Sequence, residues 1–518
     1  MSLISLSYMG LLGISSILYY CISKRFRWII LLMASYVFYV SASGSGVLYL
    51  LISTISIYIT AILLDRQNKQ LKEIKKLDKP ERKLKKQKIS RWKKVFVFIG
   101  IFINVMILLC LKYWNFFGGN FNILAQLSGI SWHISYIKII LPLGISYYTL
   151  MALSYIVDVY RGKYEASYHL GKVALYLSFF PQMTEGPISR FDQSADALFS
   201  GNRFKMENIR AGCYLILWGV FKKMVIADRA AVFVNTVFSA PSQGLLSIAA
   251  VALYTLQIYA EFSAAMDIVR GSAWMFGVYL PQNFKRPFFS KSIAEFWRRW
   301  HITLGTWLKD YVFYSVSLSK PNMRLNRYIN KHMKNALGKF ILMAFPLFFV
   351  WFGNGFWHGA TWKYIFYGLY YYLIMMLGLL IQPLFSTINK RWNIESRAWY
   401  KVFQILRTTM IVMIGMMIFR AETLSKAWSM LIGMANIIPV QLFEHGLVKI
   451  DFFVLLLGAG MMFVLSIYQE KGGNVQVLVD KKSLVLRYTI VLLILTLIVI
   501  FGMYGKGYHA SDFIYGGF

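Results

Sequence analysis

The sequence is short of charge, of acidic residues and of cysteine. Only 15% of its 518 residues are charged, and 22 Asp and Glu stand against 56 Lys and Arg. So few charges among 58% hydrophobic residues exclude a soluble globular protein of this length. The three cysteines, Cys21, Cys110 and Cys213, lie in or beside apolar runs without metal-ligand spacing. We interpret them as packing residues and predict neither a disulfide framework nor a metal site.

Several catalytic motifs are missing as well. The sequence contains no HExxH, paired CxxC, P-loop or GxSxG motif, so zinc hydrolysis, nucleotide hydrolysis and nucleophile-elbow chemistry lack support. No small-residue cleavage site follows the first apolar run, where Lys24–Arg27 leads into another run instead. We therefore expect the first helix to be retained. Acyl transfer that uses a general base remains open.

Apolar runs long enough to cross a bilayer are abundant. A spanning helix needs about 20 apolar residues, and by that criterion we count roughly a dozen runs. They predict an all-α polytopic membrane protein with roughly 11–13 membrane helices in a single integral-membrane domain, residues 1–518. The runs are 3–21, 28–40, 47–64, 95–111, 137–157, 211–226, 245–260, 340–352, 364–381, 402–419, 452–467 and 484–501.

The formal net charge is +34, and most of the basic residues lie in the segments that connect these apolar runs. Anionic lipid headgroups and membrane topology explain it, so we predict a lipid bilayer and no nucleic acid as the partner of this charge. The segment 65–94 is the most basic, and the positive-inside rule makes it a cytoplasmic loop. Counting outward from it places both termini on the extracellular side, with residues 506–518 as an extracellular tail.

The middle of the chain, residues 168–339, has a different pattern. Its apolar stretches are short, and prolines and basic residues interrupt them. Irregular backbone at membrane depth is tolerated only where protein or a water-filled cavity covers it. We therefore predict re-entrant or horizontal helices here, arranged around a central funnel.

The first candidate group of functional residues lies within 292–311. If this segment is one helix, Trp300 lies on an aromatic face and His301 lies on another face with Arg298. An amphipathic helix at the membrane interface explains the segment equally well. Arg298 could pair with a donor phosphate or a carboxylate, although such a side chain commonly reaches to lipid headgroups.

The second candidate group, residues 352–362, lies between two strongly apolar runs. His358 is the one ionisable residue between Lys339 and Lys363. An ionisable group at membrane depth usually faces a protein interior and marks a site, and histidine suits base chemistry near neutral pH. A neutral structural histidine is the competing interpretation. Asn354 and Trp357 are further candidates to contact the substrate.

At these positions the sequence resembles the membrane-bound O-acyltransferase family, in particular its bacterial branch that serves alginate O-acetylation and teichoic acid D-alanylation. The resemblance covers most of the chain. It rests on the blocks LPLGISYYTLMALSYIVDVYRG (141–162), SFFPQMTEGPISR (178–190), LPQNFKRPFFSKSIAEFWRRWHITLGTWLKDYVF (280–313), FWHGATW (356–362) and FRAETL (419–424).

The resemblance implies an acyltransferase in which His358 is the catalytic base and His301 is a second functional histidine. His358 would remove a proton from an acceptor hydroxyl as it attacks a thioester carbonyl, and His301 would orient the donor or stabilise the oxyanion. The implied donor is a cytoplasmic thioester, acetyl-CoA or an acyl-carrier protein, used as a substrate, with no bound cofactor. The acceptor would be a cell-wall or extracellular polysaccharide, reached through an extracellular SGNH-like acyltransferase partner. Tyr515 in the aromatic tail would relay the acyl group, although a tail lying in the headgroup region is an alternative.

One departure from the family pattern concerns the segment before residue 280. Asp267 keeps its place as a possible substrate contact, but residues 264–266 are Ala-Ala-Met, where members usually have a different run. Alternatives to acetyl transfer therefore stay open. They are D-alanyl transfer from a carrier protein to teichoic acid, a polytopic transporter or flippase, and a non-catalytic scaffold.

Overall fold

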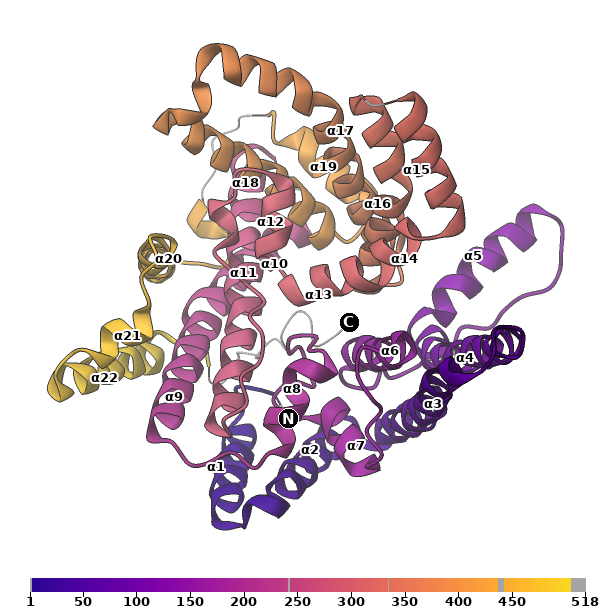
Figure 1. The fold of residues 1–518 in the computed structure, drawn as a ribbon. Helices are drawn as coiled ribbons and strands as arrows, with labels where there is room; N and C mark the ends of the chain where they lie inside the picture. Colours follow the sequence, from indigo (N-terminus) through magenta and orange to yellow (C-terminus); the bar gives the residue numbers. More distant parts are fainter. Residues whose placement is uncertain (1, 241–242, 334, 437–441, 505–518) are drawn as a thin grey trace. The chain divides into compact units, whose positions relative to one another are not determined.

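The computed structural model describes residues 2–240, 243–333, 335–436 and 442–504 (Figure 1). Within these ranges every regular element is a helix, and no strand occurs. The chain divides into two compact units. Among the described residues, the first unit comprises 2–213 and 269–281, and the second comprises those within 214–268 and 282–504.

Eight stretches of the described residues are long and apolar enough to cross a membrane, which confirms an all-α polytopic membrane protein. The predicted run 484–501 coincides with α22 (Leu484–Phe501). Two of the eight stretches, Lys24–Lys76 and Lys79–Leu127, include several consecutive helices. Three predicted spans fall on shorter helices, α1 (Leu6–Cys21), α6 (Ile145–Arg161) and α9 (Met206–Phe221), so the count of such stretches is lower than the sequence predicted.

The first unit is built on three long helices that pack together, α3, α4 and α6. Another packed group consists of α1, α2 and α7, in which α2 contacts both of the others. The bounds of the helices introduced here are α2 (Arg27–Ser43), α3 (Val47–Glu73), α4 (Lys79–Leu108), η4 (Leu109–Tyr113), α5 (Trp114–Leu127), α7 (Leu170–Ser178) and α8 (Phe191–Phe199).

Two predictions about this unit need correction. The basic segment 65–94 is mostly helical, because α3 continues to Glu73 and α4 begins at Lys79. The predicted span 137–157 begins too early, since residues 130–142 have no regular structure. Asn115 of α5 explains this by accepting a hydrogen bond from Ile137 N (2.9 Å) and donating to Ile137 O (2.8 Å). These bonds satisfy backbone groups that a helix would otherwise use.

The second unit contains the remaining long helices and several short ones. The segments 214–221 of α9 (Met206–Phe221) and 244–268 of α11 (Gly244–Met275) belong to it, because the unit boundaries fall inside these helices. The others are η5 (Lys222–Ala227), α10 (Asp228–Ser239), η6 (Pro287–Phe289), α12 (Ile293–Arg299), α13 (Ile302–Trp307), η7 (Leu308–Phe313), α14 (Tyr314–Ser317), α15 (Lys320–His332), α16 (Ala336–His358), α17 (Trp362–Trp392), η8 (Ile394–Ser396), α18 (Ala398–Arg420), α19 (Leu424–Gly433), η9 (Leu442–Glu444), α20 (Lys449–Glu470) and α21 (Val475–Asp480).

The middle of the chain, residues 168–339, contains several short helices beside the 32-residue α11. The helices α7, α8 and α12–α14 have between 4 and 9 residues each. Their inclination to a membrane, and the predicted funnel, stay predictions.

The helices α16 and α17 cross closely, and this crossing positions the end of α16. A Cβ on Gly355 would lie 2.2 Å from Tyr364 O, and a Cβ on Gly368 would lie 2.2 Å from Trp351 O. Only glycine lets the two backbones approach this closely, which is a common device between membrane helices. The crossing fixes the last turn of α16, where His358 lies.

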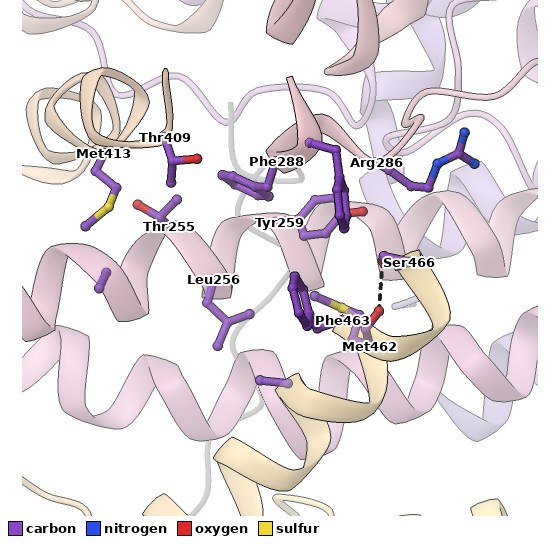
Figure 2. Close-up of a pocket in the computed structure, with 13 residues that line it drawn as sticks. Thr255, Leu256, Tyr259, Arg286, Phe288, Thr409, Met413, Met462, Phe463 and Ser466 are labelled. Carbon is purple, nitrogen blue, oxygen red and sulfur yellow. Dashed lines mark hydrogen bonds between the residues drawn. The ribbon is translucent and has the colours of Figure 1, made fainter. Parts of the chain in front are cut away.

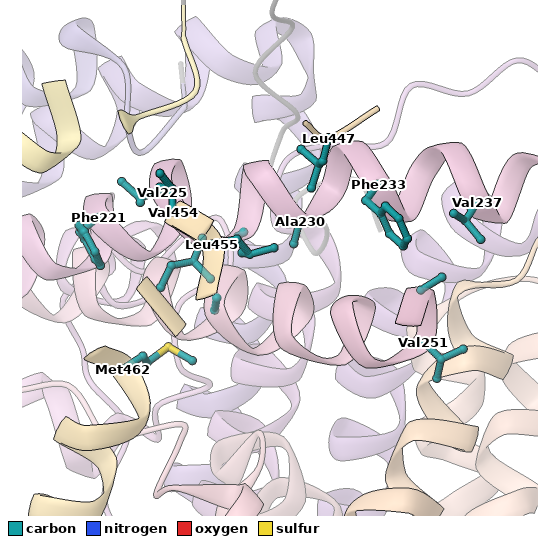
Figure 3. Close-up of a cluster of buried hydrophobic side chains, with 14 of the residues drawn as sticks. Phe221, Val225, Ala230, Phe233, Val237, Val251, Leu447, Val454, Leu455 and Met462 are labelled. Carbon is teal, nitrogen blue, oxygen red and sulfur yellow. The ribbon is translucent and has the colours of Figure 1, made fainter. Parts of the chain in front are cut away.

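A buried hydrophobic cluster holds η5, α10 and α20 together in the second unit (Figure 3). Phe221, Val225 and Phe233 come from consecutive helical segments, and Leu455 and Met462 of α20 pack against them. All are at most 8% exposed. Lipid tails are as apolar as these side chains, so close van der Waals packing holds such helices together in a bilayer, and this cluster is a packed apolar core of these helices.

Candidate active site

The segment around His301 is a helix break, whereas the sequence analysis considered one continuous helix. The helix α12 begins where Ser292 Oγ accepts a hydrogen bond from Glu295 N (3.2 Å). It ends at Arg299, and α13 begins at Ile302. His301 between them has φ 44° and ψ 51°, in the left-handed region that non-glycine residues rarely adopt. The face assignment of His301 beside Arg298 was therefore wrong.

Asn283 is the physical reason for this break. Its side-chain Oδ1 accepts hydrogen bonds from Thr303 N (3.0 Å) and Thr303 Oγ1 (2.7 Å). Its backbone oxygen accepts from Ile302 N (3.0 Å), and Lys285 N donates to Arg299 O (2.9 Å). The chain at 283–285 thus takes over the backbone groups that a continuous helix would pair internally. A left-handed residue persists only where its surroundings fix it, and such residues cluster at functional sites.

The imidazole of His301 is buried against aromatic rings. It is 2% exposed, and the Phe262 ring lies 4.8 Å from it, centroid to centroid, in an edge-to-face arrangement. Burial lowers the pKa of His301 to about 3, because the interior disfavours the charged form. The side chain is therefore a neutral imidazole near pH 7, with one nitrogen able to donate and one able to accept.

His358 ends α16 and is 3% exposed. The rings of Phe419 and Tyr367 lie edge-on to it, with centroids at 5.2 and 5.9 Å. Phe419 comes from the last turn of α18 and Tyr367 comes from α17. Three helices therefore enclose this imidazole, as expected for an ionisable group at a functional position in a membrane protein.

Trp357 links the two histidines. Its ring centroid lies 5.7 Å from that of His301 and 5.0 Å from that of His358. Trp357 is itself buried, at 8% exposure. One indole in contact with both imidazoles brings residues 57 positions apart in the sequence into one site.

Two other predicted residues lie next to these histidines in the chain. Asn354 is buried one helical turn before His358, on the same side of α16, and its Oδ1 makes no hydrogen bond to the described residues. It is an available acceptor near the base. Trp300 precedes His301 but packs against Phe284 and Phe296, with ring centroids at 5.0 and 5.4 Å. Trp300 therefore belongs to the aromatic cluster next to His301 in the chain.

The structure does not bring Arg298 or Asp267 into contact with the histidines. Arg298 is exposed. Asp267 forms an ion pair with Lys222 Nζ at 2.8 Å, and the same Nζ donates to Ser263 Oγ at 2.7 Å. Tyr515 lies outside the described residues. Among those residues, no group of three or more His, Cys, Asp or Glu side chains could hold a metal ion.

Sequence reasoning missed the residues that shape the site. Phe262, Tyr367 and Phe419 enclose the two imidazoles, but single aromatic residues in apolar runs give no signal that separates them from core residues. Lys222 and Lys223 did carry a signal, since two consecutive lysines inside the apolar run 211–226 are unusual.

Comparison with known proteins adds an independent finding. Residues 165–420, which contain both histidines, match the model of the membrane-bound O-acyltransferase family. The chain is 32% identical to "Probable alginate O-acetylase AlgI" of Azotobacter vinelandii over 422 residues, 80% of this chain and 74% of that protein.

More distant relatives carry other names. The chain is 28% identical to "Peptidoglycan O-acetyltransferase" of Helicobacter pylori over 68% of this chain and 67% of that protein. It is 29% identical to "Teichoic acid D-alanyltransferase" of Streptococcus thermophilus over 54% of this chain and 68% of that protein. The extent of the first match and the position of the family model together establish that this multi-pass membrane chain belongs to the membrane-bound O-acyltransferase family and is an O-acyltransferase.

Proposed function

We propose that the chain transfers an acetyl group from a cytoplasmic thioester, acetyl-CoA or an acyl-carrier protein, across the cytoplasmic membrane of a bacterium for O-acetylation of an extracellular polysaccharide. The observation that carries the proposal is the pair of buried imidazoles, His301 and His358, in contact with one indole, Trp357. Relatives named for alginate and peptidoglycan acetylation support the acetyl group and a polysaccharide acceptor. An extracellular SGNH-like enzyme would complete the transfer to the polymer.

In the proposed reaction His358 is the general base. Its neutral imidazole takes the proton of an acceptor hydroxyl while the hydroxyl oxygen bonds to the thioester carbonyl carbon. The carbon–sulfur bond then breaks, and the proton passes to the leaving thiolate, so that a free thiol and an ester result. General-base catalysis of this kind contributes about 10²–10⁴-fold to a rate.

His301 is proposed to act on the donor. Because burial keeps its imidazole neutral, it can donate one hydrogen bond to the thioester oxygen as negative charge develops there. Removal of one such donor in other acyl-transfer enzymes costs about 10²–10³-fold in rate. Asn354 is proposed to contact the acceptor beside His358. Arg298, because of its charge, and Asp267, because of the resemblance, stay proposed substrate contacts.

Tyr515 is proposed to carry the acetyl group between the two steps. Its phenol would be the first acceptor, and the extracellular partner would take the acetyl group from it. If Tyr515→Phe leaves polymer acetylation at the wild-type level, the relay is wrong, and the acceptor hydroxyl then belongs to the partner or the polymer.

The test uses purified full-length protein and radiolabelled acetyl-CoA. We expect wild type to release free thiol and to place label on its tail or on an added partner, and His358→Ala to lose both. His332→Ala is the matched control, because His332 is exposed on α15. Equal turnover in wild type and His358→Ala would overturn the role of His358.

A second donor has specific support in the relative named for teichoic acid D-alanyl transfer. The same assay with a D-alanyl carrier protein separates the two. If wild type releases thiol only from the D-alanyl carrier protein, and His358→Ala abolishes that release, the transferred group is D-alanyl and not acetyl. The family membership leaves no reason to keep the transporter or scaffold alternatives.

A further inference from the structure

A pocket of about 380 Å³ lies within the second unit, apart from the two histidines (Figure 2). Its walls come from α11, η6, α18 and α20. Figure 2 shows Arg286 and Ser466 at one end of the pocket and Thr409 and Met413 at the other. Between the two ends the lining is mainly apolar and aromatic and includes Leu256, Tyr259 and Phe288. None of His301, Trp357 and His358 lines this pocket.

The pocket lies beside helices that cross the membrane. The helices α11, α18 and α20 are three of the eight candidate spans. Along α20 the lining runs from Ala459, near the middle of the helix, to Ser466, one turn before Glu470. The seven residue steps from Ala459 to Ser466 rise by roughly 10 Å, about a third of the ~30 Å hydrocarbon core. The lining thus follows the half of α20 that ends at Glu470.

One side of the pocket opens toward lipid. Phe463 lines it and is 58% exposed, and the ring of Phe463 stacks on Phe289 at 5.9 Å. Ala459 and Ala252 supply small side chains that leave the hollow space. An apolar hollow along one leaflet that is open to the membrane has the shape and polarity for a hydrocarbon chain.

The surface end of the pocket is basic. Arg286 Nε contacts Glu470 Oε2 at 2.6 Å, and the two terminal nitrogens of Arg286 make no hydrogen bond within the described part of the chain. Arg299 Nη1 also contacts Glu470, at 2.9 Å. The segment 285–299 carries five basic residues, Lys285, Arg286, Lys291, Arg298 and Arg299, against two acids, Glu295 of the same segment and Glu470 of α20. This end therefore favours an anion.

The backbone fixes Arg286 in this position. Arg286 has φ 49°, in the left-handed region, and Pro287 follows it. Such a conformation costs on the order of 1–3 kcal/mol in a non-glycine residue and persists only where the surroundings impose it. The structure thus holds a guanidinium with free donors at the mouth of an apolar pocket.

We propose that this pocket binds one acyl chain of an anionic phospholipid, with the headgroup phosphate on Arg286. The chain would lie against α11 and α20, and the phosphate would accept hydrogen bonds from the terminal nitrogens of Arg286. The bound lipid is a resident of the bilayer and does not react. The proposal is independent of which acyl donor the enzyme uses.

Photo-crosslinking tests the chain part of the proposal. The full-length protein is reconstituted in phosphatidylcholine vesicles that contain a trace of phosphatidylglycerol with a diazirine in its acyl chain. Mass spectrometry of the irradiated protein should find the label on Met413, Met462 and Phe463. Ala459→Trp fills the pocket and should remove this label. Leu457→Trp is the matched control, because Leu457 is 58% exposed on the same helix, and should keep it.

The charge part is tested at Arg286. Arg286→Asn suits the left-handed backbone and leaves Glu470 paired with Arg299. It should reduce labelling by the phosphatidylglycerol probe about fivefold, the effect of one cation at a membrane surface. Arg286→Lys should restore labelling. A phosphatidylcholine probe with the same diazirine should respond little to either change.

Three results would overturn the proposal. Equal labelling of Ala459→Trp and Leu457→Trp would show that the label comes from the outer protein surface. Equal labelling of wild type and Arg286→Asn would remove the anionic headgroup. Displacement of the probe by palmitoyl-CoA, but not by excess phosphatidylglycerol, would assign the pocket to an acyl donor. Ala252→Leu, a smaller filling change, replaces Ala459→Trp if the latter does not fold, and the same loss of label is then expected.

Discussion

At the scale of single residues, Trp357 is the position on which the site depends beyond its two histidines. One indole touches both imidazoles, with centroids at 5.7 and 5.0 Å. Its removal would take away the one ring that both imidazoles share, and a displacement near 1 Å at a reacting centre can cost about 10²-fold in rate.

We expect Trp357→Ala to lower kcat by about 10²-fold, with a smaller change in KM, because the indole positions catalytic groups and does not itself react. Trp357→Phe keeps a ring and should lose less. The measurement is thiol release from the donor, with kcat and KM separated. An unchanged kcat in Trp357→Ala, or an effect on KM alone, would contradict the positioning role.

His301 also predicts how stability depends on pH. Its pKa is about 3 in the folded protein because of burial, against about 6.5 in an unfolded chain. Between these values the unfolded state binds a proton that the folded state does not, so stability falls as the pH drops below about 6.5. The slope from this one group is up to about 1.4 kcal/mol per pH unit.

Thermal unfolding in detergent at pH 7 and pH 5 measures this dependence. His301→Gln should unfold with a smaller loss of Tm between these two pH values than wild type. His332→Gln, at an exposed position, should keep the wild-type loss. The burial of His301 as a neutral group is contradicted if all three proteins lose the same Tm.

At the scale of elements, the sequence predicted most of the long helices and failed where side chains bind backbone. Apolar runs locate α16, α18, α20 and α22 because their period and length are local properties. The break at His301 depends on Asn283, 18 residues earlier, which accepts hydrogen bonds from Thr303. No local pattern contains that contact. The contact of His301 with Trp357 is likewise tertiary, so spacing alone identified candidates but did not join them.

The π-helix η5 is an element with a prediction of its own. Lys223 is fully buried there, and its Nζ lies 2.8 Å from both Asp228 Oδ1 and Glu261 Oε1. Lys223→Met would leave two buried carboxylates without this cation. Breaking a buried ion pair in this way costs about 3–5 kcal/mol.

We therefore expect Lys223→Met to lower the Tm strongly or to prevent purification of folded protein. The matched control is Lys426→Met, which breaks the exposed pair of Lys426 with Glu422. Exposed pairs contribute about 0–1 kcal/mol, so this variant should unfold like wild type. Equal Tm values for the two variants would show that the η5 pair adds nothing to stability.

At the scale of the whole molecule, composition was sufficient for the membrane class, because eight long apolar helices follow directly from apolar runs. The division into two units was not predictable. Two of its boundaries fall inside α9 and α11, where no loop or proline marks them, and only the third, after Pro281, lies in a connection.

The orientation of the chain is the prediction that belongs to this scale. The basic segment 65–94 forms the facing ends of α3 and α4, and the positive-inside rule places it in the cytoplasm. The donor thioester is cytoplasmic in the proposed reaction. The same predicted orientation puts the tail on the extracellular side, where a partner could collect the acetyl group.

Cysteine labelling with a membrane-impermeant maleimide tests this orientation. Cys21, Cys110 and Cys213 are first replaced by Ser, and a single cysteine is then placed at Lys83 or at Ser511. In intact spheroplasts Ser511→Cys should react and Lys83→Cys should react only after permeabilisation. The reverse pattern would place the basic segment outside the cell and the tail in the cytoplasm. That result would contradict the predicted orientation.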